Sequence, residues 1–139
     1  MLTMGLTSVF ANNEETISQK AVSSFKKDFT QAHDVKWESS KDFVKATFKL
    51  NDQVMFAYYS QAGDLMAVTR NIVSSQLPIA LLSNLKKSYR AYWISDLFEF
   101  SSPTDASYYI TLQSAEQTLV LKSDGMNSWG VYKKEKKNS

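Results

Sequence analysis

Cysteine is absent from this chain of 139 residues, and histidine occurs once, at His33. Without cysteine the chain can form no disulfide, no thiol nucleophile and no cysteine-ligated metal site. A single histidine also excludes the paired-histidine zinc motifs. The chain has only 4 glycines and 2 prolines, whereas hydrophobic residues make up 43% of it and aromatic residues 13%. Such a composition is typical of a folded domain and not of a disordered segment.

An excess of charge of one sign is also lacking, because the formal net charge is only +2. Proteins that follow a phosphate backbone carry a stronger basic excess, so we expect no nucleic-acid partner. No apolar run approaches the ~20 residues of a membrane-spanning helix, so we expect no transmembrane segment. Part of the basic excess lies in residues 133–137, which we interpret as a solvated, frayed end.

Residues 1–11 are apolar or small, and the polar residues 12–15 follow them abruptly. Residues 9–11 resemble the end of a secretory signal with cleavage after Ala11. The stretch is short and no Lys or Arg precedes it, which fits a longer signal whose charged start is missing; the alternative is a packed or frayed N-terminal segment. We therefore expect a signal-peptide remnant at residues 1–11, a mature chain that begins near Asn12, and a periplasmic or secreted location.

Two helical patterns are each followed by alternating apolar residues, which predict strands. The stripe of the first helix is Ile17, Ala21, Phe25 and Phe29. The strands after it are expected at 35–37, 44–50, 54–60 and 64–72, with turns at Asn51-Asp52 and at Gly63. The second helix opens at Pro78 and its expected stripe is Ile79, Leu82, Leu85 and Tyr89. The strands after it are expected at 92–100, 107–113, 117–122 and 127–133.

This order of one helix and four strands occurs twice, which suggests an internal repeat. Residues 24–29 match residues 84–89, sixty positions later, and Gly63 matches Gly125. The expected organisation is a single domain at 12–134, with halves at about 13–73 and 74–134 and a tail at 135–139. The expected fold class is α+β, with two α-β-β-β-β halves forming one antiparallel sheet and both helices on one face. The other face would then be free to meet solvent or a partner.

The residues that carry a family resemblance lie along most of the chain. They are Phe25 to Phe29, Val35-x-Trp37, Phe43-Val44-x-Ala46-x-Phe48, Tyr58, Gly63-Asp64-Leu65 and Leu77-Pro78. The chain resembles the PepSY-like proteins of Bacteroidetes over about residues 16–131. The resemblance implies export and a fold similar to the β-lactamase inhibitor protein (BLIP). It implies no activity, since a shared fold does not transfer function.

Residues that could carry catalysis are few and scattered. His33 stands beside Asp34, but the nearest serines, Ser39 and Ser40, belong to no nucleophile motif. The acids are spread as singletons; the pairs Asp34 with Glu38 and Asp96 with Glu99 could converge, but nothing forces them into a pocket. The turn sequences lack the alternating acids of a calcium loop. We expect no enzyme, no metal and no cofactor.

The remaining candidate is the helix-free face of the sheet. In the first half we assume that the residues facing the helices are Val44, Ala46, Phe48, Leu50, Val54, Phe56 and Tyr58. Alternation then places on the helix-free face Phe43, Lys45, Thr47, Lys49, Met55 and Tyr59. In the second half the expected core is Tyr108, Ile110, Leu112, Leu119, Leu121, Trp129 and Val131, and Tyr109, Thr111, Val120, Lys122, Tyr132 and Trp93 join the free face. An error of one residue in register would exchange these sets.

Aromatic side chains mixed with lysines on an open face suit a protein partner. The candidate partner-binding residues are Lys45, Tyr59, Trp93, Tyr109, Lys122 and Tyr132. The expected function is therefore an exported protein-binding or inhibitor-like module, whose partner is another envelope or extracellular protein. One alternative is that strands favour aromatic residues for cross-strand packing alone. The others are a structural envelope protein that acts through self-association, and a small enzyme.

Overall fold

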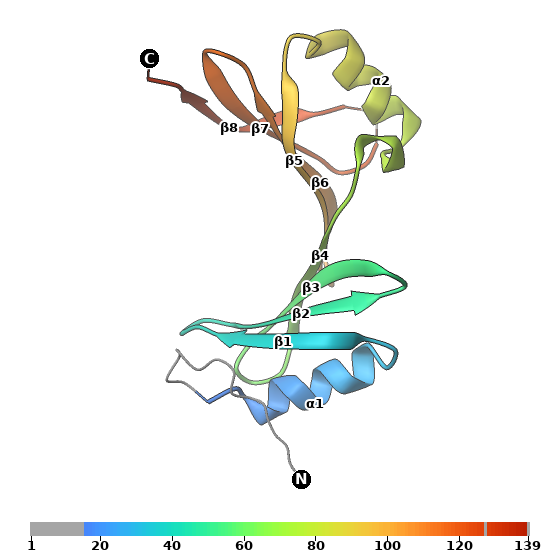
Figure 1. Ribbon diagram of the computed structural model, residues 1–139, viewed down its shortest axis with the longest axis vertical. Coiled ribbons are helices and arrows are strands. Elements are labelled where there is room, and N and C mark those ends of the chain that lie inside the picture. Colours follow the sequence, from blue (N-terminus) through green and yellow to red (C-terminus); the bar gives the residue numbers. More distant parts are fainter. Residues whose placement is uncertain (1–15, 127, 139) are drawn as a thin grey trace. The chain divides into compact units, whose positions relative to one another are not determined.

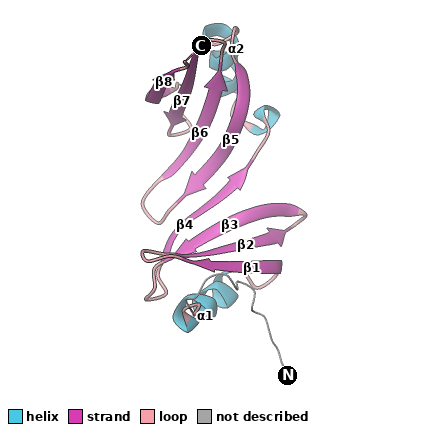
Figure 2. Ribbon diagram, turned by 60° about the vertical axis from the view of Figure 1, so that its left-hand side comes forward, coloured by secondary structure: helices cyan, strands magenta, loops and turns pink. Residues whose placement is uncertain are grey.

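Two helices and eight strands make up the computed structural model, which describes residues 16–126 and 128–138 (Figure 1). The helices are α1 (Gln19–Asp28) and α2 (Ile79–Ser88), and a short 3₁₀ turn, η2 (Ser74–Gln76), precedes α2. The strands are β1 (His33–Ser39), β2 (Val44–Leu50), β3 (Gln53–Tyr59), β4 (Leu65–Asn71), β5 (Trp93–Ser101), β6 (Ala106–Gln113), β7 (Gln117–Ser123) and β8 (Gly130–Lys136). They form one sheet whose strand order follows the chain (Figure 2). The expected α+β class is confirmed.

The chain divides into two compact units, residues 1–69 and 70–139, which we call the N-terminal and C-terminal units. Each contains one helix and its own hydrophobic core. None of the helices in the described part of the chain is long and apolar enough to cross a membrane. The expected signal remnant and the expected mature start near Asn12 lie outside the described residues.

In the N-terminal unit, α1 packs against one face of the strands through the expected stripe (Figure 1). The Ser18 hydroxyl caps the helix by accepting a hydrogen bond from the Ala21 amide at 3.2 Å. Phe25 is buried at the centre of the core, where its ring meets Trp37 at 5.2 Å and Phe48 at 5.0 Å in edge-on contacts. The periodicity of four residues in the sequence thus identified the buried face of α1 correctly.

In the C-terminal unit, the buried positions of α2 are Leu81 and Leu85. Ile79, which we expected in the stripe, is 84% exposed, so that assignment is wrong. Residues four apart lie on one face of a helix, and the buried series here is Leu77, Leu81 and Leu85. This series is the first-helix stripe shifted by sixty positions. Ile79 lies two residues away from it and therefore points to solvent.

The remaining core of the C-terminal unit follows the expected alternation on β6 and β7. Ile110, Leu112, Leu119 and Leu121 are buried, and Tyr108 and Trp129 pack against them. The Trp129 indole N–H donates to the Leu81 carbonyl of α2 at 3.1 Å. Val131 was expected in the core but is 61% exposed, so that assignment is wrong. It pairs with buried Leu121, but it lies on β8, the last strand in the sheet order, where only one side has a neighbouring strand. That strand continues to Lys136, past the expected start of the tail.

Candidate binding surface

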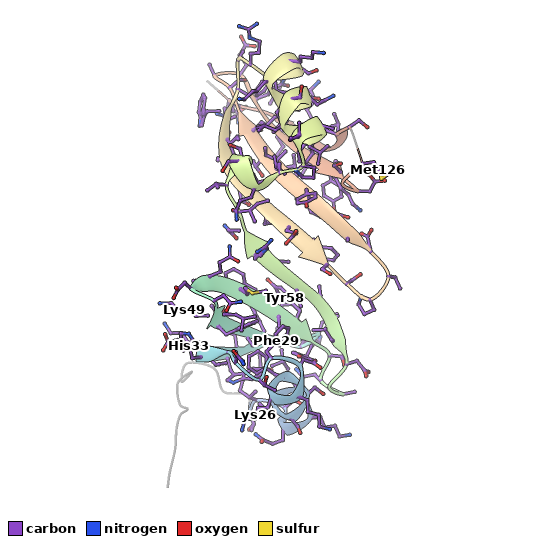
Figure 3. The ribbon with its side chains drawn as sticks, turned by 90° about the vertical axis from the view of Figure 1, so that its right-hand side faces the viewer. Lys26, Phe29, His33, Lys49, Tyr58 and Met126 are labelled. Carbon is purple, nitrogen blue, oxygen red and sulfur yellow. The ribbon has the colours of Figure 1, made fainter. Side chains whose placement is uncertain are left out.

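Aromatic rings and a lysine lie together on the helix-free face of the N-terminal unit. Lys45 and Tyr58 are direct partners across β2 and β3. The Lys45 ammonium lies 4.9 Å from the centre of the Phe56 ring and 5.8 Å from that of Tyr58. Phe43 meets Tyr58 edge-on at 5.6 Å. Figure 3 labels Tyr58 and, on the opposite side of the strands, Phe29, which packs beneath Phe48 in the core.

Tyr59, in contrast, does not lie on this face, and its expected place there is wrong. Its side chain is 0% exposed and belongs to the core beneath α1. The Tyr59 hydroxyl donates to a carboxylate oxygen of Asp28, at the end of α1, at 2.7 Å. Burial, together with this hydrogen bond and the Asp28 charge, raises the pKa of the Tyr59 phenol well above its usual value. Tyr59 therefore stabilises the fold and cannot contact a partner.

The turn between β2 and β3 explains this error. Asn51 and Asp52 both have positive φ, 51° and 64°, as a two-residue hairpin turn of the primed type requires. Leu50 therefore pairs with Gln53, and even-numbered residues of β2 face odd-numbered residues of β3. Alternation carried through the turn without this change of parity gives the wrong faces on β3. The β2 assignments are correct, but on β3 the sets are exchanged: Val54, Phe56 and Tyr58 lie on the helix-free face, and Met55, Ala57 and Tyr59 on the helix side.

A larger cluster lies on the helix-free face of the C-terminal unit. We call it the C-terminal aromatic cluster, and its members are Phe98, Phe100, Tyr109, Lys122 and Tyr132. Tyr109 is at its centre: it stacks on Phe98 at 5.2 Å and meets Phe100 at 6.0 Å and Tyr132 at 5.3 Å in edge-on contacts. Three predicted residues, Tyr109, Lys122 and Tyr132, are thus brought together by three different strands, β6, β7 and β8.

Lys122 supplies the positive charge of this cluster. It faces Tyr109 directly across β6 and β7, and its ammonium lies 5.5 Å from the centre of that ring. The Asp105 carboxylate is 3.8 Å from the same ammonium. The Tyr109 hydroxyl, with a smaller contribution from Asp105, raises the pKa of Lys122. A cation held against an aromatic ring is attracted to the negative face of the ring and is less free to move.

Trp93, the remaining predicted residue, is 57% exposed on β5. It pairs with Gln113 of β6, which lies four residues after Tyr109 on the same strand. Because side chains alternate along β6, Trp93 and Gln113 share the face of the C-terminal aromatic cluster. The Lys137 ammonium lies 5.1 Å from the centre of its ring. Phe56, Tyr58, Phe98 and Phe100 were not among our candidates. Correct parity through the Asn51-Asp52 turn would have found the first two. Phe98 and Phe100 share a face with Trp93 only because the pairing of β5 with β6 shifts by one residue between Ile94 and Asp96, and alternation along the sequence does not reveal such a shift.

A shallow depression of about 360 Å³ lies beside the cluster. Its lining residues are Lys122, Ser123, Asp124, Ser128, Gly130, Val131 and Tyr132. In residues 16–126 and 128–138, no three His, Asp or Glu side chains form a group that could hold a metal ion. His33 is exposed at the start of β1, with its imidazole 3.4 Å from the Asp34 carboxylate. The two clusters on the helix-free face thus offer aromatic contact and positive charge.

Comparisons with known proteins agree with the fold. No family model matches the chain, and no curated protein matches it at a significant level. Among solved structures, it is similar to a BLIP-like protein from Bacteroides fragilis, with a TM-score of 0.76 and 17% identity over 90% of this chain and 89% of that one. A DUF2874 family protein from Bacteroides ovatus has a TM-score of 0.73 at 16% identity, with 88% and 89% covered. A candidate periplasmic protein from Bacteroides eggerthii has a TM-score of 0.75 at 11% identity, with 88% and 90% covered. The BLIP-like fold expected from the sequence resemblance is therefore confirmed.

Proposed function

We propose that this chain is an exported, non-enzymatic binding module that holds another envelope or extracellular protein on the helix-free face of its sheet. The observation that carries the proposal is the C-terminal aromatic cluster, in which Tyr109 is surrounded by Phe98, Phe100 and Tyr132 and lies against the Lys122 ammonium. Tyr58 with Lys45 supplies a smaller contact of the same chemistry in the N-terminal unit.

The packing of these rings against one another favours binding energetically. Aromatic side chains bury a large area with few rotatable bonds, and rings already held by neighbours lose little further freedom when a partner covers them. The Tyr hydroxyls keep hydrogen-bonding groups available at the rim. Protein interfaces are enriched in such residues, and a few of them usually supply most of the binding energy.

Export and the kind of partner have separate support. The apolar residues 1–11 resemble the end of a secretory signal, and one solved structure with this fold is a candidate periplasmic protein. Similarity to a BLIP-like protein makes an inhibitor-like role one form that the binding could take. The scattered acids and the exposed His33 favour a binding module over an enzyme.

The test is affinity for a partner captured from the native envelope and then purified. Tyr109→Ala combined with Lys122→Ala removes the centre and the charge of the cluster, and should weaken binding by about 2 kcal/mol, which is roughly 30-fold in Kd. The matched control is Ile79→Ala with Lys86→Ala, which removes an exposed apolar residue and an exposed lysine from α2. It should bind like the wild type.

Circular dichroism and thermal unfolding should show that both double variants remain folded, because neither removes a buried core residue. Equal loss of binding in the two would contradict the proposal. A stable oligomer in light scattering that the Tyr109 and Lys122 changes dissolve would instead favour the alternative, a structural envelope protein that acts through self-association.

A further inference from the structure

Strand β8 leaves one edge of the sheet open among the described residues. It is the last strand in the sheet order and pairs with β7 on its other side. Alternate residues of a strand direct their N–H and C=O groups to opposite edges, so about half of these groups in β8 point away from β7. Every residue from Gly130 to Lys136 is exposed. The open edge is therefore accessible to another strand.

The regular part of this edge begins after a β-bulge and is held at its far end by hydrogen bonds. An extra residue, Tyr132, lies between the pairs Leu121 with Val131 and Val120 with Lys133, after which the pairing is regular to Lys136. Just beyond, the Lys137 amide donates to the Glu116 carbonyl at 2.9 Å, and its ammonium donates to the Ser114 carbonyl at 2.7 Å. An incoming strand would thus meet an edge that is already ordered.

The charged side chains of β8 differ between the two faces of the strand. Lys133 and Glu135 lie on one side of β8, 3.8 Å apart, and offset each other. Lys134 and Lys136 lie on the other side, opposite Leu119 and Gln117 of β7. Neither makes an ion pair with any described residue. Residues two apart in a strand are separated by roughly 7 Å, so these ammonium groups form a row with strand spacing.

Such a row selects between partners. A second copy of β8 would bring lysine against lysine, and edge lysines are a common protection against this kind of self-pairing. A strand with carboxylates at alternate positions would place each beside an ammonium and would gain main-chain hydrogen bonds as well. Exposed Val131 and the depression that it lines with Tyr132 lie at the start of the same edge, where an apolar side chain of the incoming strand could be received.

We propose that the open edge of β8 takes up an extended acidic segment of another protein as an additional strand, with carboxylates at alternate positions facing Lys134 and Lys136. This site uses the strand edge and not the helix-free face, so it goes beyond the function proposed above and does not depend on it.

The probe is a heptapeptide that alternates Glu and Val, and the control probe is the corresponding peptide of Lys and Val. Hydrogen exchange of the wild-type chain is measured with each peptide in excess. The Glu–Val peptide should slow exchange of the outward β8 amides between Lys133 and Lys136 by about tenfold or more, because these amides become hydrogen-bonded. The Lys–Val peptide should leave them unchanged.

The decisive variant is Lys134→Glu combined with Lys136→Glu, which should reverse the preference, so that the Lys–Val peptide protects β8 and the Glu–Val peptide does not. A damaged fold could not produce this gain. The matched control, Lys86→Glu with Lys87→Glu on α2, has the same net charge and should behave like the wild type.

Two results would overturn the proposal: equal slowing of β8 amide exchange by both peptides, or slowing by the Glu–Val peptide only at amides outside β8. A dimer detected by light scattering, in which the β8 amides are already protected without any peptide, would also overturn it. The Tyr109→Ala and Lys122→Ala variant should retain the peptide effect, so failure of the face proposal and failure of the edge proposal are distinguishable.

Discussion

Gly63 occupies a position where the backbone of a turn meets the backbone of a helix. Its φ is +94°, and a Cβ added there would lie 2.9 Å from the Lys20 carbonyl oxygen of α1. Two serines hold the turn against the helix: the Ser24 hydroxyl donates to the Gly63 carbonyl at 2.7 Å, and the Ser18 hydroxyl to the Gln61 carbonyl at 2.8 Å. Only glycine satisfies both the φ and the close approach.

Gly63→Ala should therefore lower the free energy of unfolding by about 2–4 kcal/mol, through backbone strain and a displaced turn. Gly125→Ala is the matched control. Gly125 has the same sign of φ, +92°, but its added Cβ would meet a Tyr108 ring carbon at an ordinary 3.5 Å. Strain alone predicts a cost of about 1 kcal/mol. Urea unfolding of both variants measures the difference, and equal costs would contradict the close approach at Gly63.

Tyr59 makes the stability of the fold depend on pH. Its phenol has a folded-state pKa above the ordinary 10.0, because burial and Asp28 disfavour the phenolate. The neutral Tyr59 phenol therefore contributes to the free energy of unfolding. That contribution is fully present below pH 10 and declines as the pH rises above it.

Tyr59→Phe should lose about 1–3 kcal/mol at pH 7, because it removes a hydrogen bond to a charged group. The difference between wild type and variant should then shrink between pH 10 and 11.5. Chemical unfolding over that pH range tests this, since the other tyrosines are common to both proteins and cancel. A difference that stays constant to pH 11.5 would contradict the raised pKa.

At the scale of the element, α2 shows that one turn of helix contains both the most and the least buried apolar residues. Leu81 is fully buried in the C-terminal core, whereas Ile79 projects into solvent. Leu81→Ala should therefore cost about 2–5 kcal/mol by creating a cavity, and Ile79→Ala should cost less than about 0.5 kcal/mol. Thermal unfolding of the two variants measures this, and similar costs would contradict a helix that buries Leu81 and exposes Ile79.

At the scale of the whole molecule, the two units have separate cores with no buried residue in common. The lysine and tyrosine pair recurs in both with the residues exchanged: Lys45 faces Tyr58 in one, and Tyr109 faces Lys122 in the other. In each unit the pair joins the second and third strands that follow the helix, β2 with β3 and β6 with β7. The same surface chemistry thus occurs once in each unit.

The proposed export concerns the whole chain, and it predicts a defined N-terminus. Protein recovered from the native envelope should begin near Asn12, because residues 9–11 resemble a cleavage site and polar residues follow. Intact-mass measurement with N-terminal sequencing tests this. Recovery of chains that retain Met1 from the cytosol would contradict export.

Much of the architecture could be predicted from local pattern. The stripe of α1, the order of one helix and four strands, and the core of β6 and β7 all follow from residue spacing, because helix and strand repeat at 3.6 and 2 residues. The candidate surface was predictable only in part. Lys45, Trp93, Tyr109, Lys122 and Tyr132 are where we expected them, whereas Tyr59 and Ile79 are not.

The sequence by itself determined which segments form helices and strands, since that depends on the spacing of neighbouring residues. Tertiary structure decided which face of β3 and of α2 is covered. The two-residue turn at Asn51 and Asp52 exchanges the faces of β3, and the contact of Leu81 and Leu85 with the strands sets the rotation of α2. A shift of one residue in strand register or helix rotation leaves local propensity unchanged but moves a side chain from the core to solvent. Only packing between distant segments can therefore determine which face is buried.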